Sequence, residues 1–217
     1  MNLCKPLDDK QLAHLLSLGG PRIWAKGETL FRAADPMGSF FKIRSGIVAV
    51  SRVLDDGRRQ VVALRAPGDC IGYLEQDGNY AFEGQALTEV EACAFHRRQF
   101  DAFAATNADL AAATGEALSR ALKGAGQAML VLGQLKSTER LAHFLVEIDS
   151  LYRERHVAQS PLSLFMNRNQ IADYLGLTVE TVSRAFGRLR KQGVIELAGG
   201  DEIVIRDHAR LRGIGKA

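Results

Sequence analysis

The sequence predicts an α+β protein in three successive parts: an N-terminal antiparallel β-roll of the cupin-like jelly-roll type, a long dimerisation helix and a C-terminal winged helix-turn-helix. Short β-branched runs separated by turn residues fill residues 20–105. From residue 107 the apolar residues recur in steps of three and four. Further on, two short helical patterns are broken at a glycine. We therefore expect a sensor-like β-roll at 1–106, the long helix at 107–136 and the winged motif at 137–217.

Composition favours a globular protein without a membrane span. The chain has 217 residues, of which 47% are hydrophobic and 24% are charged. No apolar run approaches the roughly 20 residues that a membrane helix needs, and the N-terminus becomes charged before a signal peptide could form. The three cysteines, Cys4, Cys70 and Cys93, are too widely spaced for a disulfide framework. We expect a cytoplasmic location, where thiols stay reduced.

The first half of the chain has the pattern of short strands. Turn signals separate its apolar runs at Gly46, at Asp56-Gly57 and at Pro67-Gly68. Polar residues such as Ser51 and Arg52 interrupt the runs, as expected for strands with one solvent-exposed face. Strands at roughly ten-residue spacing favour a barrel or a sandwich over βαβ units.

The central helix carries a narrow apolar seam. Its spacing is that of the a and d positions of a coiled coil, whereas a helix packed on its own domain shows a wider apolar stripe. Small residues at 111, 115 and 125 would let a second helix approach closely. We expect a homodimer, with a helix buried inside one chain as the alternative. The predicted dimerisation residues are Leu118, Leu122, Ala125, Met129 and Leu132.

Two short helices joined by a glycine follow downstream. Asn167 can cap a helix over residues 168–175, and Thr178 can cap a second helix. Gly176 supplies the turn between them, where a positive φ is expected. A small residue in the first helix, a glycine in the turn and a branched apolar residue in the second are spaced as in a helix-turn-helix. The residues that meet these demands are Ala172, Gly176 and Val182.

The outward face of the second helix predicts a contact with DNA bases. Glu180 and Arg184 lie four residues apart, so both side chains project to one side, with Ser183 beside them. In a major groove Arg184 can donate to O6 and N7 of guanine, and Glu180 can accept from the N4 amino group of cytosine. The alternative is a surface ion pair between the two. The predicted base-reading residues are Val179, Glu180, Ser183 and Arg184.

Basic residues and a hairpin surround that helix. Residues 160–217 contain nine Lys or Arg and six Asp or Glu, which accounts for the whole net charge of +3. Two short alternating runs around Gly199-Gly200 predict a hairpin, the wing, whose tip could lie against the sugar-phosphate backbone. Backbone contacts position a protein on DNA without reading its sequence. The expected partner is double-stranded DNA, and the predicted backbone contacts are Arg168, Thr178 and Arg188.

With these residues in place, the chain resembles the CRP/FNR family of bacterial transcription regulators over nearly its whole length. The family's order of β-rich half, long helix and winged motif is present, with "PGD" at residues 67–69. The pattern Glu180-x-x-Ser183-Arg184 matches the FNR and FixK branch. The resemblance implies a homodimer that binds a TTGAT/ATCAA-type palindrome and recruits RNA polymerase, usually as an activator. Resemblance to FixK also implies that no cofactor is required.

The resemblance also indicates where a sensor ligand would bind. The cyclic-nucleotide branch uses a Gly-Glu pair and an Arg-Ser or Arg-Thr pair, but here Asp69 stands at the glutamate position and Tyr80 at the arginine position. We do not expect cyclic nucleotide, because its phosphate would be buried without a cation. Cys93 matches the β-domain ligand of the FNR iron–sulfur cluster and Cys4 its last N-terminal ligand, but three thiols cannot supply four unless others precede Met1. The lone His96 of the β-domain does not indicate haem.

Two alternatives to a cofactor-independent regulator stay open. One is a redox sensor that uses Cys4 or Cys93. The other is a small-molecule sensor whose pocket lies near Tyr80 and Phe82 and gates DNA binding. No Ser/His/Asp, Cys/His or His-x-His arrangement is recognisable, so neither a catalytic site nor a metal site is expected.

Overall fold

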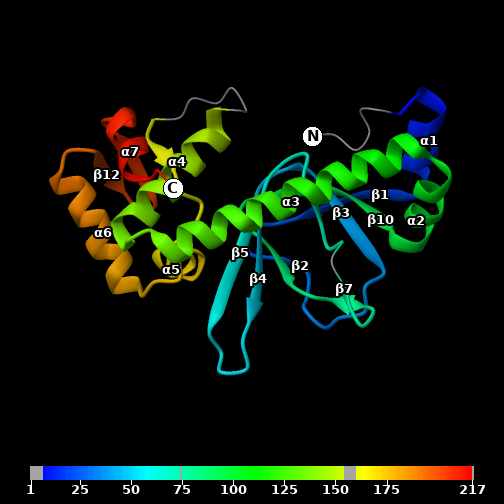
Figure 1. The fold of residues 1–217 in the computed structure, drawn as a ribbon, viewed down its shortest axis with the longest axis horizontal. Helices are drawn as coiled ribbons and strands as arrows, with labels where there is room; N and C mark the ends of the chain where they lie inside the picture. Colours follow the sequence, from blue (N-terminus) through cyan, green and yellow to red (C-terminus); the bar gives the residue numbers. More distant parts are fainter. Residues whose placement is uncertain (1–6, 74, 154–159, 217) are drawn as a thin grey trace. The chain divides into compact units, whose positions relative to one another are not determined.

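The computed structural model describes residues 7–73, 75–153 and 160–216, and it divides into two compact units, Met1–Ala125 and Gly126–Ala217 (Figure 1). The long helix α3, Ala108–Gln134, belongs to both units, because the division falls inside it. No helix within the described ranges is both long and apolar enough to cross a membrane. Cys4, one of the two predicted redox cysteines, lies outside the described residues.

The first unit is built on two four-stranded antiparallel sheets, with strand orders β1-β10-β3-β6 and β2-β9-β4-β5, and on a short pair, β7-β8. Strands distant in sequence lie side by side, as β1 and β10 do, which confirms the predicted β-roll. The strands are β1 Gly19–Trp24, β2 Thr29–Phe31, β3 Ser39–Ser45, β4 Val48–Val53, β5 Arg59–Arg65, β6 Cys70–Ile71, β7 Glu75–Gln76, β8 Asn79–Tyr80, β9 Glu83–Ala86 and β10 Val90–His96.

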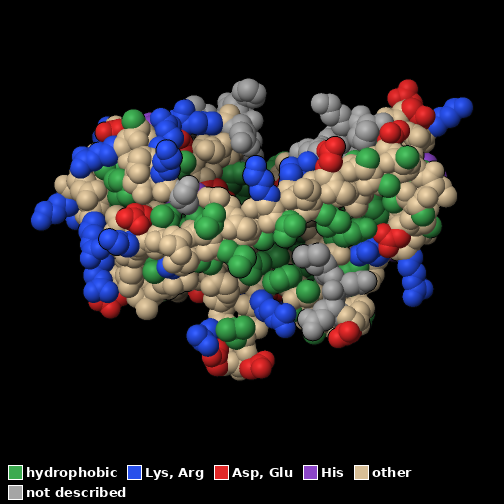
Figure 2. Space-filling model, viewed as in Figure 1, with side chains coloured by type: hydrophobic (Ala, Val, Ile, Leu, Met, Phe, Trp, Pro, Cys, Tyr) green, Lys and Arg blue, Asp and Glu red, His purple; other side chains and the backbone are tan. Residues whose placement is uncertain are grey.

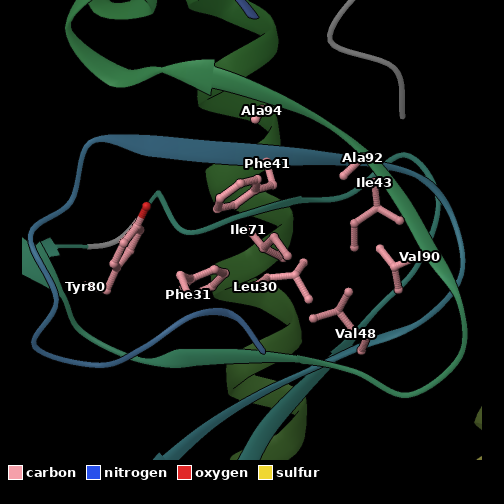
Figure 3. Packing of buried hydrophobic residues seen from close by; sticks show 11 residues of the cluster. Leu30, Phe31, Phe41, Ile43, Val48, Ile71, Tyr80, Val90, Ala92 and Ala94 are labelled. Atoms are coloured by element: carbon pink, nitrogen blue, oxygen red, sulfur yellow. The ribbon is translucent and has the colours of Figure 1, made fainter. Parts of the chain in front are cut away.

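The inside of the roll is filled by apolar side chains from both sheets (Figure 3). Phe31 packs against Phe41 and Tyr80, with ring centroids 5.7 and 4.7 Å away. Gly84 leaves room for the Phe31 ring, because a Cβ at position 84 would lie only 2.6 Å from a carbon of that ring. Burying a side chain of this size contributes about 1.5–3 kcal/mol to the free energy of folding. The aromatic cluster is therefore a main source of the roll's stability.

A second apolar cluster, the outer cluster, lies on the other face of the β1-β10-β3-β6 sheet. Phe40 and Phe95 project from the sheet, and Leu15, Phe100 and Leu110 cover them from three helices. All five side chains are at most 1% exposed. The helices are α1 Asp9–Ser17, α2 Arg97–Thr106 and the beginning of α3. The start of the long helix is thus anchored on the roll.

The second unit is a helical core with a small sheet, and it confirms the predicted winged helix-turn-helix. Helix α4 packs against α5, α6 and α7, and α5 packs against α6. The sheet order is β11-β13-β12, in which β12 and β13 form the wing hairpin. The elements are α4 Ser137–Arg153, β11 Leu162–Ser163, α5 Arg168–Leu175, α6 Val179–Lys191, β12 Ile195–Gly199, β13 Glu202–Ile205 and α7 His208–Ile214.

One arginine joins the helices of the second unit. The Arg140 guanidinium on α4 donates to the carbonyl oxygens of Leu132 (2.5 Å), Leu135 (2.9 Å) and Leu175 (3.0 Å). These oxygens lie at or just beyond the ends of α3 and α5, where a helix leaves its last carbonyls without intrahelical partners. A planar guanidinium with five donors satisfies all three at once. Arg140 therefore ties the end of α3 to the first helix of the helix-turn-helix.

Candidate DNA-binding surface

Local hydrogen bonds set both ends of the first helix of the motif. The Asn167 side chain accepts from the Gln170 amide (3.0 Å), and the Gln170 side chain accepts from the Asn167 amide (2.9 Å), which closes a capping box at the start of α5. At the other end Gly176 has a φ of 61°, and its amide donates to the Ala172 carbonyl. Glycine adopts this left-handed conformation at little cost. The predicted cap and the predicted turn are both confirmed.

The second helix of the motif begins at the predicted cap and is held from its inner side. Thr178 Oγ1 accepts from the Thr181 amide (3.2 Å). Three side chains of α6, Val182, Phe186 and Leu189, are each at most 2% exposed. The direction of α6 is therefore fixed by the core of the second unit. The predicted phosphate contact of Thr178 has to share a hydroxyl that already caps the helix.

The four predicted base-reading residues lie together on the exposed face of α6. Val179 is 40% exposed. The Glu180 and Arg184 side chains are 77% and 60% exposed, and their charged atoms are 3.5 Å apart. The Ser183 hydroxyl donates to the Val179 carbonyl (2.9 Å). An exposed ion pair of this kind contributes about 0–1 kcal/mol to the stability of the protein. The Glu180 and Arg184 side chains can therefore exchange it for another partner at little cost.

Arg168, a predicted phosphate contact, is half-buried in the structure. Its guanidinium carbon lies 3.6 Å from the centroid of the Phe186 ring, on which it stacks. Its Nη1 is buried and has no hydrogen-bond partner within the described part of the chain. Burial lowers the pKa of Arg168, while the nearby Asp201 carboxylate opposes that shift. Arg168 thus packs the two motif helices together, a role that sequence spacing did not indicate because the contact is between different helices.

The wing and the end of α6 add glycines and positive charge. Gly199 and Gly200 at the wing tip have φ values of 104° and 56° and are exposed. An ion pair between Arg206 and Glu196 joins the two arms of the wing at their base. Lys and Arg side chains gather on the surface over α6 (Figure 2). The exposed basic residues in the second half of α6 are Arg188, Arg190 and Lys191.

Comparisons with known proteins agree with this arrangement. Profiles of the Crp-like helix-turn-helix domain and of the cyclic nucleotide-binding domain match residues 139–214 and 21–107. The chain is 35% identical over 219 residues to the nitrogen fixation regulation protein FixK of Bradyrhizobium diazoefficiens, across 99% of this chain and 90% of that protein. The chain belongs to the CRP/FNR family of transcription regulators.

Two further similarities place this CRP/FNR chain near the FixK branch. It is 34% identical over 215 residues to the transcriptional activator protein anr of Pseudomonas aeruginosa, across 96% of this chain and 87% of that protein. The structure of FixK2 from Bradyrhizobium japonicum matches with a TM-score of 0.80 and 32% identity, covering 92% of this chain and 98% of that one. The chain is therefore a FixK-like DNA-binding transcription regulator and not an enzyme.

The two residues at the positions that bind the nucleotide in the cyclic-nucleotide branch of the CRP/FNR family make hydrogen bonds within the protein here. Tyr80, at the arginine position, is 8% exposed, and its hydroxyl donates to the Ser39 carbonyl (2.6 Å). Burial raises the pKa of Tyr80, so the phenol is neutral at physiological pH. Asp69, at the glutamate position, accepts from the Ala66 amide (3.0 Å) and closes a turn. The Tyr80 ring belongs to the packed core of the roll.

The remaining sensor candidates are dispersed over the roll. Cys93 on β10 is half-buried, and His96 is exposed at the start of α2 without a side-chain cap bond. Within the described ranges, no three His, Cys, Asp or Glu residues are grouped to hold a metal ion. A cavity of about 380 Å³ lies elsewhere than at Tyr80 and Phe82. Its polar lining residues include Ser17, Arg22, Ser39, His96 and Gln99.

Proposed function

We propose that the protein is a homodimeric transcription activator that binds a TTGAT/ATCAA-type palindrome and recruits RNA polymerase without a required cofactor. The observation that carries the proposal is the exposed face of α6. Its four side chains stand at the start of a capped helix whose opposite side is fixed in the core. Residues at the N-terminal end of a recognition helix are the ones that meet base edges in the major groove.

The chemistry of this face matches the single G·C pair of the TTGAT half-site. Arg184 can donate two parallel hydrogen bonds to O6 and N7 of the guanine, and Glu180 can accept from N4 of the cytosine paired with it. The ion pair between these two side chains has a length of 3.5 Å in the free protein, so both can turn to one base pair. Ser183 and Val179 are placed beside them, where a hydroxyl and a methyl group can contact neighbouring bases. Thr178 and Arg188 are proposed phosphate contacts.

The proposed dimer uses the seam of α3. Leu118 is 44% exposed, and Leu122 and Met129 are each 75% exposed. Exposed apolar side chains of this size on one helix face are typical of an interaction site. Ala125 is exposed in the same seam, while Leu132 is half-buried within its own unit. A two-fold dimer would present two α6 helices to two half-sites, which is what a palindrome requires.

The relatives, and not the geometry, support the proposals about activation and location. The Pseudomonas aeruginosa relative is named a transcriptional activator, which supports recruitment of RNA polymerase by this chain. DNA and polymerase meet in the bacterial cytoplasm, so we propose that location. The buried, hydrogen-bonded Tyr80 in place of a phosphate-binding arginine supports function without cyclic nucleotide.

A regulator gated by a small molecule is the second candidate, and the 380 Å³ cavity favours it. Arg22 and His96 line that cavity, so a small anion is the matching ligand class. Cavities of about 300–1,000 Å³ are the usual size for such ligands. Under this alternative the purified protein would not bind its operator until the ligand is added.

Fluorescence anisotropy separates the two candidates. Air-purified protein without added ligand is titrated onto a TTGAT/ATCAA duplex and onto a scrambled duplex at one fixed physiological salt concentration, because DNA affinity depends strongly on salt. The proposal predicts tight binding to the palindrome, at least about a thousandfold tighter than to the scrambled duplex. Equal affinity for the two duplexes would contradict the cofactor-independent function and favour the gated alternative.

A further inference from the structure

A threonine of α6 links the cap of that helix to the arginine proposed to read a base. Thr181 Oγ1 lies 2.8 Å from Thr178 Oγ1, the oxygen that caps α6. It also accepts a hydrogen bond from Arg184 Nη2 at 3.4 Å. The Thr181 amide donates to the same cap oxygen at 3.2 Å. A continuous chain of polar contacts therefore runs from Thr178 through Thr181 to Arg184.

Both hydroxyl groups can take part in this chain whichever of them donates to the other. A hydroxyl group has one proton and two acceptor lone pairs. If Thr178 donates, Thr181 Oγ1 accepts with one lone pair and keeps the second for Arg184. If Thr181 donates, both of its lone pairs stay open to Arg184. The contact with the guanidinium therefore does not depend on where this proton lies.

Thr181 is the more firmly held member of the pair that it forms with Arg184. Its side chain is half-buried, and its β-branched shape restricts its first torsion angle in a helix. The Arg184 side chain is long and 60% exposed. Fixing such a side chain on a DNA base costs rotamer entropy. An acceptor that already restricts the guanidinium in the free protein lowers that cost.

The Arg184 guanidinium can keep this contact while it reads a base. It carries five N–H donors, and O6 and N7 of a guanine need two of them. Glu180, the ion-pair partner of Arg184 at 3.5 Å, gives up that contact when it accepts from the cytosine as proposed. The Thr181 hydroxyl can stay in place, so it continues to orient the guanidinium in the complex with DNA.

We propose that Thr181 is a positioning residue for sequence reading: its hydroxyl holds the Arg184 guanidinium in the orientation that donates to guanine. The inference rests on the proposed function of α6 and adds to it a residue that need not touch DNA. A group that acts only through Arg184 contributes to the discrimination of G·C from A·T and not to affinity for DNA in general. This property separates a positioning role from a backbone contact, which carries no sequence information.

Two substitutions separate the hydroxyl from the rest of the side chain. Thr181→Val keeps the β-branched shape and the amide that donates to the Thr178 cap, and it replaces only the hydroxyl. Valine and threonine have similar helix propensities, so α6 should stay folded, which circular dichroism checks. Thr181→Ser keeps the hydroxyl and is the matched control.

The test measures Kd by fluorescence anisotropy on the TTGAT/ATCAA duplex and on a duplex whose G·C pairs are replaced by A·T, both at one fixed salt concentration. Thr181→Val should bind the first duplex roughly two- to tenfold more weakly for each half-site, and the second duplex as tightly as the parent does. Thr181→Ser should bind both like the parent. In an Arg184→Ala background, Thr181→Val should have no further effect, because both changes then remove the same interaction.

Three results would overturn the positioning role. An unchanged Kd of Thr181→Val on the TTGAT/ATCAA duplex would show that the hydroxyl does not orient Arg184. Equal losses on the two duplexes would make Thr181 a backbone contact. A loss that persists in the Arg184→Ala background would show that Thr181 acts independently of the arginine.

The Arg184→Ala variant alone distinguishes a failure of this inference from a failure of the proposed function. If Arg184→Ala loses affinity only on the duplex that has the G·C pairs, the proposed function holds, and any of the three results above removes Thr181 alone. If Arg184→Ala loses equally on both duplexes, the proposed base reading fails and the positioning role fails with it.

Discussion

The two charged side chains proposed to meet DNA bases make only weak contacts in the free protein. The ion pair of Glu180 and Arg184 is 3.5 Å long and exposed. Exchanging such a pair for hydrogen bonds to bases loses at most about 1 kcal/mol. Arg168, stacked on Phe186, is the contrasting case, because it is committed to packing within the protein.

The cap of the recognition helix yields a prediction about stability. In Thr178→Ala the Thr181 amide loses its acceptor, which should lower the free energy of unfolding by about 0.5–2 kcal/mol. Thr178→Ser keeps the hydroxyl and should stay close to the parent. Urea unfolding followed by circular dichroism measures the difference. Equal losses in both variants would mean that the methyl group, and not the cap, matters.

Tyr80 yields a prediction about pH. Burial raises the pKa of this phenol in the folded state, so the unfolded chain ionises first as pH rises. The stability that Tyr80 contributes should be complete below pH about 10, the unfolded pKa. It should be lost as pH rises further, through the folded pKa. In Tyr80→Phe, the free energy of unfolding from urea titrations should fall less steeply over about pH 9–11, and an unchanged slope would contradict this account.

At the scale of elements, α3 is anchored at its start and end and exposed between them. Leu110 is fully buried in the outer cluster, and Leu132 accepts from Arg140. Between these points Leu122 and Met129 are each 75% exposed. The helix therefore presents an apolar face that neither compact unit covers by its own packing.

A charge in that face tests the dimer. Leu122→Glu would bury an unpaired carboxylate between two helices, which is strongly unfavourable, so it should give monomers with weak operator binding. Lys123→Glu, at the next exposed position of the same helix, is the control and should remain dimeric. Sedimentation velocity measures both variants. A dimeric Leu122→Glu protein would place the interface elsewhere.

At the scale of the whole molecule, a two-fold dimer must meet two half-sites on one side of the duplex. Half-sites about 10–10.5 bp apart, or a multiple of that spacing, satisfy this requirement. Inserting about 5 bp between the halves of the palindrome turns one half-site to the far side of the DNA. Anisotropy should then show affinity close to that for a single half-site, whereas undiminished binding would mean that the subunits bind independently.

The sequence predicts this molecule best where the determining contacts are local. The cap at Asn167, the positive φ at Gly176 and the cap at Thr178 depend on residues within one or two helical turns, and all three are confirmed. The roles of Arg168 and Arg140 were not predictable, because their partners lie on other helices. The spacing of residues along the sequence does not indicate a contact between different helices.

In the β-roll, too, contacts between residues distant in the sequence were not predictable. Alternating apolar residues indicated strands, but the pairing of Cys93 with Lys42, and of Lys42 with Cys70, arises only from the order β10-β3-β6. The three residues are far apart in the chain, and sequence spacing gave no register between their strands. The cysteines could therefore be noticed singly from the sequence, but not as neighbours of one lysine.

A binding cycle on one base pair tests directly whether α6 reads DNA sequence. Kd is measured by anisotropy for the parent and for Arg184→Ala, on the TTGAT/ATCAA duplex and on a duplex with the G·C pair of each half-site replaced by A·T. If Arg184 reads the guanine, Arg184→Ala should lose about 1–3 kcal/mol of binding free energy on the first duplex and almost nothing on the second. Arg188→Ala, a proposed phosphate contact, should lose the same amount on both. An equal loss for Arg184→Ala on the two duplexes would show that Arg184 contacts only the backbone and that α6 does not read this base pair.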